Sequence, residues 1–278
     1  MNTSNSNIYL PRETEITAIR QETSDIKTFV LKFKDAAYGD AFTYRPGQFV
    51  EFSVFGEGEA TFCISNSPTR KTIECSAKKM GMVTQAMHEL NVGDTVGLRG
   101  PYGNGFPVED LKGKHLLFVS GGIGLAPLRS LINYCLDNRD DYLDITIVNG
   151  ARTSKDLVYR DEYKVWEKAP GTKVHLTVDC REEDWVCMVG VVPKALEEIK
   201  PTCNGSVAIV CGPPIMIRFT IPVLEKMGFC PESIITTLEM KMKCGLGKCG
   251  RCNIGNHYIC KDGPVFNYAK LKELHYEL

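Results

Sequence analysis

Four cysteines crowd into seventeen residues near the end of this 278-residue chain, and their spacing restricts the local fold more than any other feature. They are Cys244, Cys249, Cys252 and Cys260, in the pattern Cys-x4-Cys-x2-Cys-x7-Cys. The first three match the run that holds a plant-type 2Fe-2S cluster. Interspersed glycines suit a loop that needs positive φ angles and backbone N–H groups close to the sulfurs. A zinc site on the same cysteines is the alternative, although zinc ribbons favour two Cys-x2-Cys pairs.

The overall composition is that of an ordinary globular protein in a reducing compartment. The other eight cysteines are scattered, often among apolar neighbours, and are expected to be mostly buried free thiols. The net charge is −1, from 33 basic and 34 acidic residues, which does not point to nucleic acid or an anionic membrane as a partner. The start of the chain lacks the features of a signal peptide, and no apolar stretch reaches the roughly 18 residues of a membrane span. We therefore expect a cytoplasmic protein with no membrane span.

The first part of the chain, residues 9–110, is expected to form an antiparallel β-barrel. Short segments rich in Val, Ile, Thr and Phe alternate with turns marked by Gly and Pro. These β segments include residues 15–21, 28–33, 49–54, 72–76 and 95–100. One helix, Thr84 to Leu90, is expected to interrupt them. The spacing is typical of a small barrel.

The pattern changes in residues 111–232, where strands alternate with helices. Expected strands at 115–119, 144–149, 173–178 and 205–211 precede expected helices at 126–136, 156–168, 192–199 and 215–227. This alternation predicts a Rossmann-like domain with a parallel sheet. The cysteine-rich residues 233–278 then form a small third domain. The predicted fold class is thus α/β plus β, in three domains.

The turn after the strand at 115–119 is a candidate nucleotide-binding site. Its candidate residues are Gly121, Gly122, Ile123, Gly124 and Pro127. Glycines let the backbone approach a pyrophosphate, and the following helix offers free N–H donors and partial positive charge. The strict Gly-x-Gly-x-x-Gly pattern is not met, so a plain strand–helix turn is the alternative.

Two further segments are expected at the same edge of the parallel sheet, where ligands of open α/β sheets bind. One is the strand-to-helix switch that contains Cys211, Gly212, Pro213 and Met216. The other contains Arg152, which follows the second strand, where the adenosine ribose or its 2′-phosphate is usually bound. Arg152 and Lys155 suit a 2′-phosphate, but the sequence does not decide between NAD and NADP.

The glycine turn, the Cys-Gly-Pro-Pro-Ile-Met segment and the terminal cysteines together resemble the ferredoxin–NADP reductase superfamily. The cysteine cluster narrows the resemblance to iron–sulfur flavoprotein electron-transfer subunits. This group is typified by the sulfhydrogenase gamma subunit, the dihydroorotate dehydrogenase electron-transfer subunit and the corresponding subunit of anaerobic sulfite reductase. The resemblance extends from about residue 9 to the end of the chain. It implies an FAD-binding barrel, an NAD(P) domain and a C-terminal 2Fe-2S domain.

The resemblance also implies where FAD binds in the barrel. The superfamily motif Arg-x-Tyr-Ser corresponds to Ala60–Cys63, and the candidate flavin residues are Phe62, Cys63, Ile64 and Ser65. Phe62 keeps the aromatic position that packs on the isoalloxazine. Ala60 replaces the arginine and so removes a charge-assisted contact with the pyrophosphate. The segment of Gly81, Met82, Val83 and Thr84, which opens a helix, is expected to hold the pyrophosphate through N–H groups and the Thr84 hydroxyl.

The function implied by the resemblance is electron transfer between NAD(P)H, FAD and the 2Fe-2S cluster. Electrons pass to or from a larger catalytic subunit, in either direction, without a catalytic acid, base or nucleophile on this chain. One alternative is a free-standing NAD(P)H:acceptor reductase, such as an oxygenase reductase. A second is a zinc-stabilised interaction protein that has lost its flavin, for which Ala60 is the only supporting feature.

Overall fold

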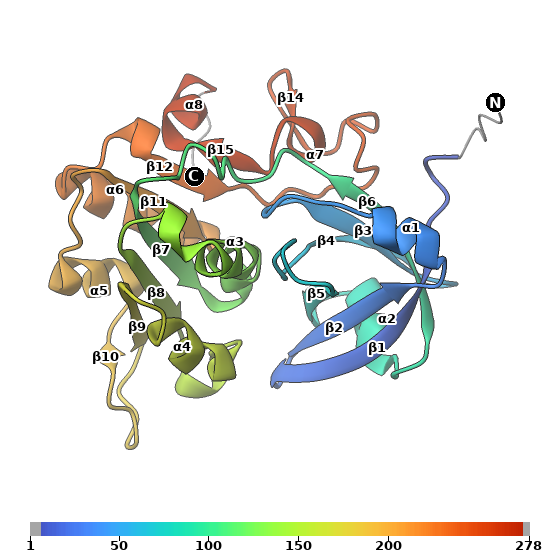
Figure 1. Cartoon of the computed structure of the whole chain (residues 1–278), viewed down its shortest axis with the longest axis horizontal. Helices are drawn as coiled ribbons and strands as arrows, with labels where there is room; N and C mark the ends of the chain where they lie inside the picture. Colours follow the sequence, from blue (N-terminus) through green and yellow to red (C-terminus); the bar gives the residue numbers. More distant parts are fainter. Residues whose placement is uncertain (1–6, 275–278) are drawn as a thin grey trace.

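The first lobe of the molecule is a six-stranded antiparallel sheet. The computed structural model describes residues 7–274, and this lobe lies at the right of Figure 1. It contains β1 (Arg12–Thr23), β2 (Ile26–Phe33), α1 (Ala36–Ala41), β3 (Phe49–Val54), β4 (Gly58–Cys63), β5 (Ile73–Lys78), α2 (Met82–Glu89) and β6 (Thr95–Tyr102). The strand order is β4-β3-β6-β1-β2-β5. Strands β4 and β5 are the two edges of this sheet.

The two edges approach each other just after β4, which gives the sheet a barrel-like shape. The backbone N–H of Ser65 donates to the carbonyl of Glu74 in β5 at 2.8 Å. Fully buried Phe29, Phe52 and Leu98 fill the interior. The predicted antiparallel barrel is thus confirmed as a barrel-like sheet.

Two details of this lobe differ from the sequence-based expectation. Helix α2 begins at Met82 and not at Thr84. A second helix, α1, was not predicted, so the expectation of a single helix is wrong. Helix α1 has six residues and buries none of them, and therefore leaves no apolar periodicity in the sequence. Its one signal is Asp35, whose side chain caps the helix by accepting a hydrogen bond from the N–H of Tyr38 at 3.1 Å.

The second lobe, at the left of Figure 1, is built on a seven-stranded sheet of order β10-β9-β8-β7-β11-β12-β15. Up to residue 233 it contains β7 (His115–Gly121), α3 (Leu125–Asp137), β8 (Ile145–Ala151), α4 (Arg160–Glu167), β9 (Thr172–Val178), β10 (Met188–Val189), α5 (Val192–Ile199), β11 (Ser206–Cys211) and α6 (Pro214–Lys226). Single 3-10 turns are η1 (Gly122–Gly124), η2 (Arg139–Asp141), η3 (Ser154–Asp156) and η4 (Pro231–Ser233). All strand pairs except β12–β15 are parallel, as the alternating pattern predicted.

Helices cover both faces of this sheet because each buries one apolar stripe. Side chains of α3 and α4, among them Leu128 and Trp166, pack in one core, and those of α5 and α6, among them Leu196 and Ile221, pack in another. The chain runs outward from β7 in both directions, through β8 and β9 on one side and β11 and β12 on the other. The gap between β7 and β11 is therefore the topological switch point, where open sheets bind ligands.

The C-terminal segment lies across the top of both lobes in Figure 1. Its elements are β12 (Ile234–Thr237), β13 (Asn253–Ile254), β14 (His257–Tyr258), α7 (Ile259–Asp262), β15 (Val265–Asn267) and α8 (Tyr268–Glu273). Strands β12 and β15 complete the second sheet, so the boundary expected at 232/233 falls ahead of two of its strands. The loop between them packs on Phe49 and Tyr102 of the first lobe. Of residues 7–274, none belongs to a helix long and apolar enough to cross a bilayer.

Candidate functional site

The glycine turn lies at the switch point of the second sheet. Strand β7 ends at Gly121, η1 covers residues 122–124, and α3 follows directly. Gly122 has a φ of +56°, which favours glycine, and an added Cβ there would meet nothing within 4 Å. The turn is therefore open on one side. The N–H of Leu125, the first residue of α3, already donates to the carbonyls of Gly122 and Ile123, so the N–H groups left for a ligand are those at the start of η1. This geometry suits a pyrophosphate.

The Cys211–Met216 segment packs directly against this turn. A Cβ on Gly124 would lie 2.4 Å from the Cα of Gly212, and one on Gly121 would lie 2.7 Å from the Sδ of Met216. Only glycine fits at position 124, because a Cβ there would force the two backbones apart, whereas at Gly121 the Met216 side chain would have to move. The two segments predicted to bind the nucleotide, 90 residues apart in sequence, thus lie together at one edge of the second sheet.

The predicted ribose position lies at the end of β8. Arg152 is exposed there, one residue beyond the strand. Sequence reasoning missed Glu182, which comes from the loop after β9 and accepts a hydrogen bond from the N–H of Ser154 at 3.1 Å. A basic residue, Arg152, and an acidic residue, Glu182, therefore lie at the same turn. No local pattern in the sequence links Glu182 to a turn 28 residues earlier.

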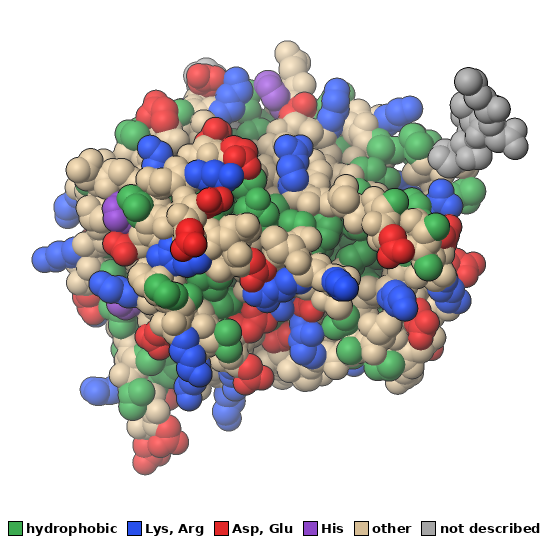
Figure 2. All heavy atoms as spheres, viewed as in Figure 1, with side chains coloured by type: hydrophobic (Ala, Val, Ile, Leu, Met, Phe, Trp, Pro, Cys, Tyr) green, Lys and Arg blue, Asp and Glu red, His purple; other side chains and the backbone are tan. Residues whose placement is uncertain are grey.

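The predicted flavin residues follow strand β4 toward the seam between the lobes. Phe62 is half-buried and meets Phe52 edge-on at 6.1 Å between ring centroids. Ile64 and Ser65 are fully buried. The Ser65 hydroxyl donates to the carbonyl of Glu74 at 3.1 Å, so this hydroxyl holds the barrel edge. Apolar side chains surface along the seam in the space-filling view, above a mixed group of acidic and basic side chains (Figure 2).

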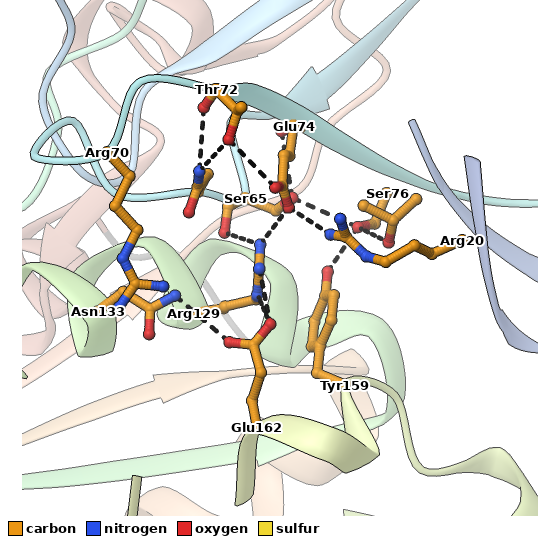
Figure 3. A network of polar contacts seen from close by, with 12 residues as sticks. Arg20, Ser65, Arg70, Thr72, Glu74, Ser76, Arg129, Asn133, Tyr159 and Glu162 are labelled. Atoms are coloured by element: carbon orange, nitrogen blue, oxygen red, sulfur yellow. Dashed lines mark hydrogen bonds and ion pairs between the residues drawn. The ribbon is translucent and has the colours of Figure 1, made fainter. Parts of the chain in front are cut away.

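A buried charge network joins the two lobes beneath the flavin segment (Figure 3). Arg129 of α3 donates to the backbone carbonyl of Ser65 at 2.9 Å and to Glu74 Oε2 of β5 at 2.8 Å. It also pairs with Glu162 of α4 at 2.6 Å. Burial alone would raise the pKa of Glu74, but Arg129 and Arg20 outweigh it and hold that pKa below its usual value. The network fixes the helix of the nucleotide turn against the flavin segment.

The other predicted flavin segment opens helix α2. The Thr84 hydroxyl accepts hydrogen bonds from the N–H groups of Met80 and Gly81, both at 2.8 Å. It is therefore committed to the start of the helix. The N–H groups of Met82 and Val83, in the first turn, are left as the donors that an anion would meet.

Two thiols flank the seam, half-buried Cys63 and buried Cys211. Cys63 of β4 and Cys211 of β11 pack in the same apolar cluster, and burial raises the pKa of each thiol. The Cys211 Sγ lies 2.7 Å from the hydroxyl of Thr237. Glu239, which sequence reasoning missed, follows β12 near both thiols, and desolvation raises the pKa of its carboxyl although the side chain reaches solvent. Its position beyond a strand at the switch-point edge was the available signal.

The cysteine loop directs backbone N–H groups at its sulfurs. The N–H of Gly247 lies 3.1 Å from the Sγ of Cys260, and the N–H groups of Leu246 and Lys248 each lie 3.4 Å from the Sγ of Cys244. Burial opposes ionisation of Cys244, but the N–H groups of Leu246, Lys248 and Cys249 outweigh it and lower the pKa of this thiol to about 6, whereas burial raises that of Cys260. A loop that favours a thiolate is what metal ligation requires.

The four sulfurs are arranged as two pairs. Cys244 neighbours Cys249, and Cys252 neighbours Cys260. Within residues 7–274, no three histidines, cysteines or carboxylates converge as a single metal ion requires. The Cys244 thiol also influences Cys260, so the two pairs belong to one loop.

The cysteine loop is tied to the first lobe. The Arg99 guanidinium of β6 donates to the carbonyl of Cys244 at 3.3 Å and pairs with Glu59 of β4. Asn104 donates to the carbonyl of Val265 at 2.7 Å. The cysteine loop thus lies beside β6 of the barrel-like sheet.

Comparison with known families gives two matches. Residues 118–221 match the model of the oxidoreductase NAD-binding domain, and residues 239–272 match the iron–sulfur cluster binding domain of dihydroorotate dehydrogenase B. The matched regions contain the glycine turn and all four clustered cysteines.

Curated relatives match over nearly the whole chain. Sulfhydrogenase 1 subunit gamma of Pyrococcus furiosus is 40% identical and covers 95% of this chain and 93% of its own length. A probable dihydroorotate dehydrogenase B (NAD(+)) electron transfer subunit of Methanocaldococcus jannaschii is 32% identical, with 92% and 90% covered.

Solved structures show the same fold. A structure of the NADH-dependent reduced ferredoxin–NADP oxidoreductase superimposes with a TM-score of 0.73 at 24% identity, covering 95% of this chain and 93% of that one. The FAD/NAD-binding domain of a nitric oxide dioxygenase from Vibrio cholerae gives 0.72 at 19% identity, covering 82% and 98%.

Proposed function

Because the chain belongs to the family of iron–sulfur electron-transfer subunits that includes the sulfhydrogenase gamma subunits and those of dihydroorotate dehydrogenase B, we propose that it links NAD(P)H to a partner redox subunit through FAD and a 2Fe-2S cluster. The relatives' names describe subunits, which supports a larger catalytic partner for this chain. The presence of both matched domains in one chain supports an oxidoreductase role.

The observation that carries this proposal is the linkage between the three sites. Arg129 connects the helix of the nucleotide turn to the carbonyl of Ser65 in the flavin segment. Arg99, on β6 of the barrel-like sheet that also carries the flavin segment, donates to the carbonyl of the cluster ligand Cys244. Electron transfer needs cofactors held at fixed separations, and these two buried arginines supply the fixed points.

The flavin supplies the conversion between hydride transfer and single-electron transfer when it is bound. The chain's own residues position it: Phe62 offers a face for the ring, and the first turn of α2 offers N–H groups for the pyrophosphate. The open side of Gly122, at the start of η1, receives the dinucleotide. Burial raises the pKa of the Cys63 and Cys211 thiols, which lie beside the seam.

A 2Fe-2S cluster is the proposed occupant of Cys244, Cys249, Cys252 and Cys260. The Cys-x4-Cys-x2-Cys spacing supports it, as does the match of residues 239–272 to an iron–sulfur cluster binding domain. A zinc ion would need all four at one centre. The N–H groups of Leu246, Gly247 and Lys248 would stabilise the negative charge of the cluster.

The proposed location is the cytoplasm. The eight cysteines outside the cluster loop are all free thiols, which fits a reducing compartment. Only Cys75, Cys135 and Cys211 of them are buried, so the expectation that most are buried is wrong.

The test is cofactor analysis of anaerobically purified protein together with its co-purifying subunits. We expect one flavin and two irons per chain, and a larger redox subunit in the same complex. One zinc without flavin would contradict the cofactor assignment. Protein with both cofactors but no partner would instead support a free-standing NAD(P)H:acceptor reductase.

A further inference from the structure

The cluster segment has an unusual charge balance. Residues 240–261 contain five basic residues and no acid, in a chain whose 33 basic and 34 acidic residues nearly balance overall. We call these residues the basic collar: Lys241, Lys243, Lys248, Arg251 and Lys261. All five are exposed. Over residues 7–274, no ion pair involves any of them.

The collar surrounds the open side of the cluster loop. Cys252 and Cys260 are buried, whereas Cys249 is exposed between Lys248 and Arg251. Lys261 lies against the same loop, since a Cβ on Gly247 would be 3.2 Å from its Cδ. Cys249 is the most exposed of the four cysteines, so a protein that approaches the cluster there meets the charges of Lys248 and Arg251 first.

Two acids near the collar are already engaged, whereas Glu239, two residues before Lys241, is exposed and forms no ion pair within residues 7–274. Glu59, close to Lys243, pairs with Arg99. Asp262 accepts a hydrogen bond from the N–H of Tyr258 at 2.7 Å. The collar charge is therefore available to an external partner.

Compensation of the cluster's own negative charge is the alternative role for these residues. The groups that reach the sulfurs, however, are backbone N–H donors at 3.1–3.4 Å. The Lys248 ammonium and the Arg251 guanidinium are in no hydrogen bond with a sulfur, and both side chains are exposed to solvent. This arrangement favours an outward role.

We propose that the basic collar is the docking surface for an acidic protein face that surrounds the partner's redox centre. Complementary charge around two redox centres raises the encounter rate and orients the partners, and it does so less at high salt. The inference rests on the proposed function, since it assumes that electrons cross at the cluster. It adds the chemistry of the partner: an acidic surface patch.

The test measures electron transfer from photoreduced holoprotein to two haem proteins of opposite charge. The acidic probe is the soluble haem domain of cytochrome b5, and the basic probe is cytochrome c. We expect the rate with the acidic probe to fall as salt rises, and the rate with the basic probe to rise. The double variant Lys248→Glu/Arg251→Glu should slow the acidic probe at least about tenfold at low salt.

The matched control is Lys164→Glu/Lys168→Glu on α4, which makes the same charge change at exposed positions far from the cluster loop (Figure 1). This control should retain the wild-type rate. An unchanged rate in the collar variant, or an equal loss in the control, would overturn the proposal. A shift of the cluster's reduction potential in the collar variant without a change in salt dependence would assign the collar to charge compensation instead.

Photoreduction keeps this test separate from the proposed function. If NAD(P)H fails to reduce the cluster but the photoreduced protein shows the expected salt dependence, the collar proposal stands and the NAD(P)H relay fails. If NAD(P)H reduces the cluster and salt dependence is absent, the relay stands and the collar proposal fails.

Discussion

Arg129, on the helix that begins at the nucleotide turn, donates a hydrogen bond to the carbonyl of Ser65, in the flavin segment, at 2.9 Å. The Arg129 side chain is 5% exposed and also forms ion pairs with Glu74 and Glu162, whose side chains are 7% and 23% exposed. One side chain thus sets how the two lobes meet where hydride transfer is proposed (Figure 3).

Replacing Arg129 with Met should destabilise the protein and slow its reaction with NAD(P)H. Two acids would lose their buried partner, at a cost of about 3–5 kcal/mol. A misplacement of the lobes by about 1 Å is enough to reduce the rate of flavin reduction about a hundredfold. Denaturant unfolding and stopped-flow absorbance at the flavin band measure the two effects.

Arg70→Met is the matched control for Arg129. Arg70 also pairs across the lobes, with Asp137 at 3.2 Å, but these side chains are 40% and 30% exposed. The expected loss is below about 1 kcal/mol, because exposed pairs contribute little. Equal losses of stability in the two variants would show that burial of the Arg129 network does not determine how much it contributes to the free energy of unfolding.

The contact between Gly124 and Gly212 makes Gly124→Ala a specific lesion of the nucleotide site. The added Cβ would lie 2.6 Å from the carbonyl oxygen of Cys211, so the two segments must separate. We expect about a hundredfold slower flavin reduction by NAD(P)H, with unchanged flavin and iron content. Gly39→Ala, whose Cβ would be 3.5 Å from its nearest neighbour, should react normally. Loss of flavin in Gly124→Ala would argue against a separate dinucleotide site.

The choice between NADH and NADPH should depend on the balance between Arg152 and Glu182. A 2′-phosphate near Ser154 would be repelled by the Glu182 carboxylate and attracted by Arg152. Glu182→Gln should therefore raise kcat/KM for NADPH relative to NADH about fivefold, the effect of about 1 kcal/mol. Arg152→Gln should shift the ratio the other way. Identical ratios in both variants would place the ribose elsewhere.

Buried Glu51 should make stability fall as pH rises. Desolvation raises its pKa to about 7, helped by the nearby Glu59, although the Thr61 hydroxyl and Arg99 oppose the shift. The folded state therefore holds the proton more tightly than the unfolded state between pH 4.5 and about 7. Over this window the stability should drop by about 3 kcal/mol and then level off.

Thermal melts of wild type and Glu51→Gln from about pH 5 to pH 8 measure this effect. The glutamine keeps the hydrogen bond with Thr61 but does not ionise. Its melting temperature should stay level where that of the wild type declines. Parallel curves for the two proteins would exclude Glu51 as the titrating group.

Much of the architecture was predictable because it follows from local patterns. Helix α5 was predicted at 192–199 and spans Val192–Ile199, since its apolar residues recur with helical period. Helix α1 was missed because it buries nothing. Strand β15, with three residues, was not separable from the cysteine loop and finds its place only by pairing with β12.

The site residues were predictable where they belong to short sequence motifs. They were not predictable where they depend on contacts between residues far apart in the sequence. The glycine turn and the Cys-Gly-Pro-Pro-Ile-Met segment each have a local signature, and the structure brings them into contact. The Arg129 network joins residues 33 to 64 positions apart, so no window of sequence reveals it. The Thr84 hydroxyl looked free in sequence, whereas it accepts bonds from two backbone N–H groups.

The most direct test of the relay is freeze-quench EPR spectroscopy after anaerobic addition of NADH or NADPH to the oxidised holoprotein. The account predicts that the flavin absorbance bleaches and that a signal of spin one-half, typical of a reduced 2Fe-2S cluster, grows as it does so. A Cys249→Ser variant should still bleach its flavin but lose or alter that signal. Bleaching in the wild-type protein without any cluster signal would contradict the account.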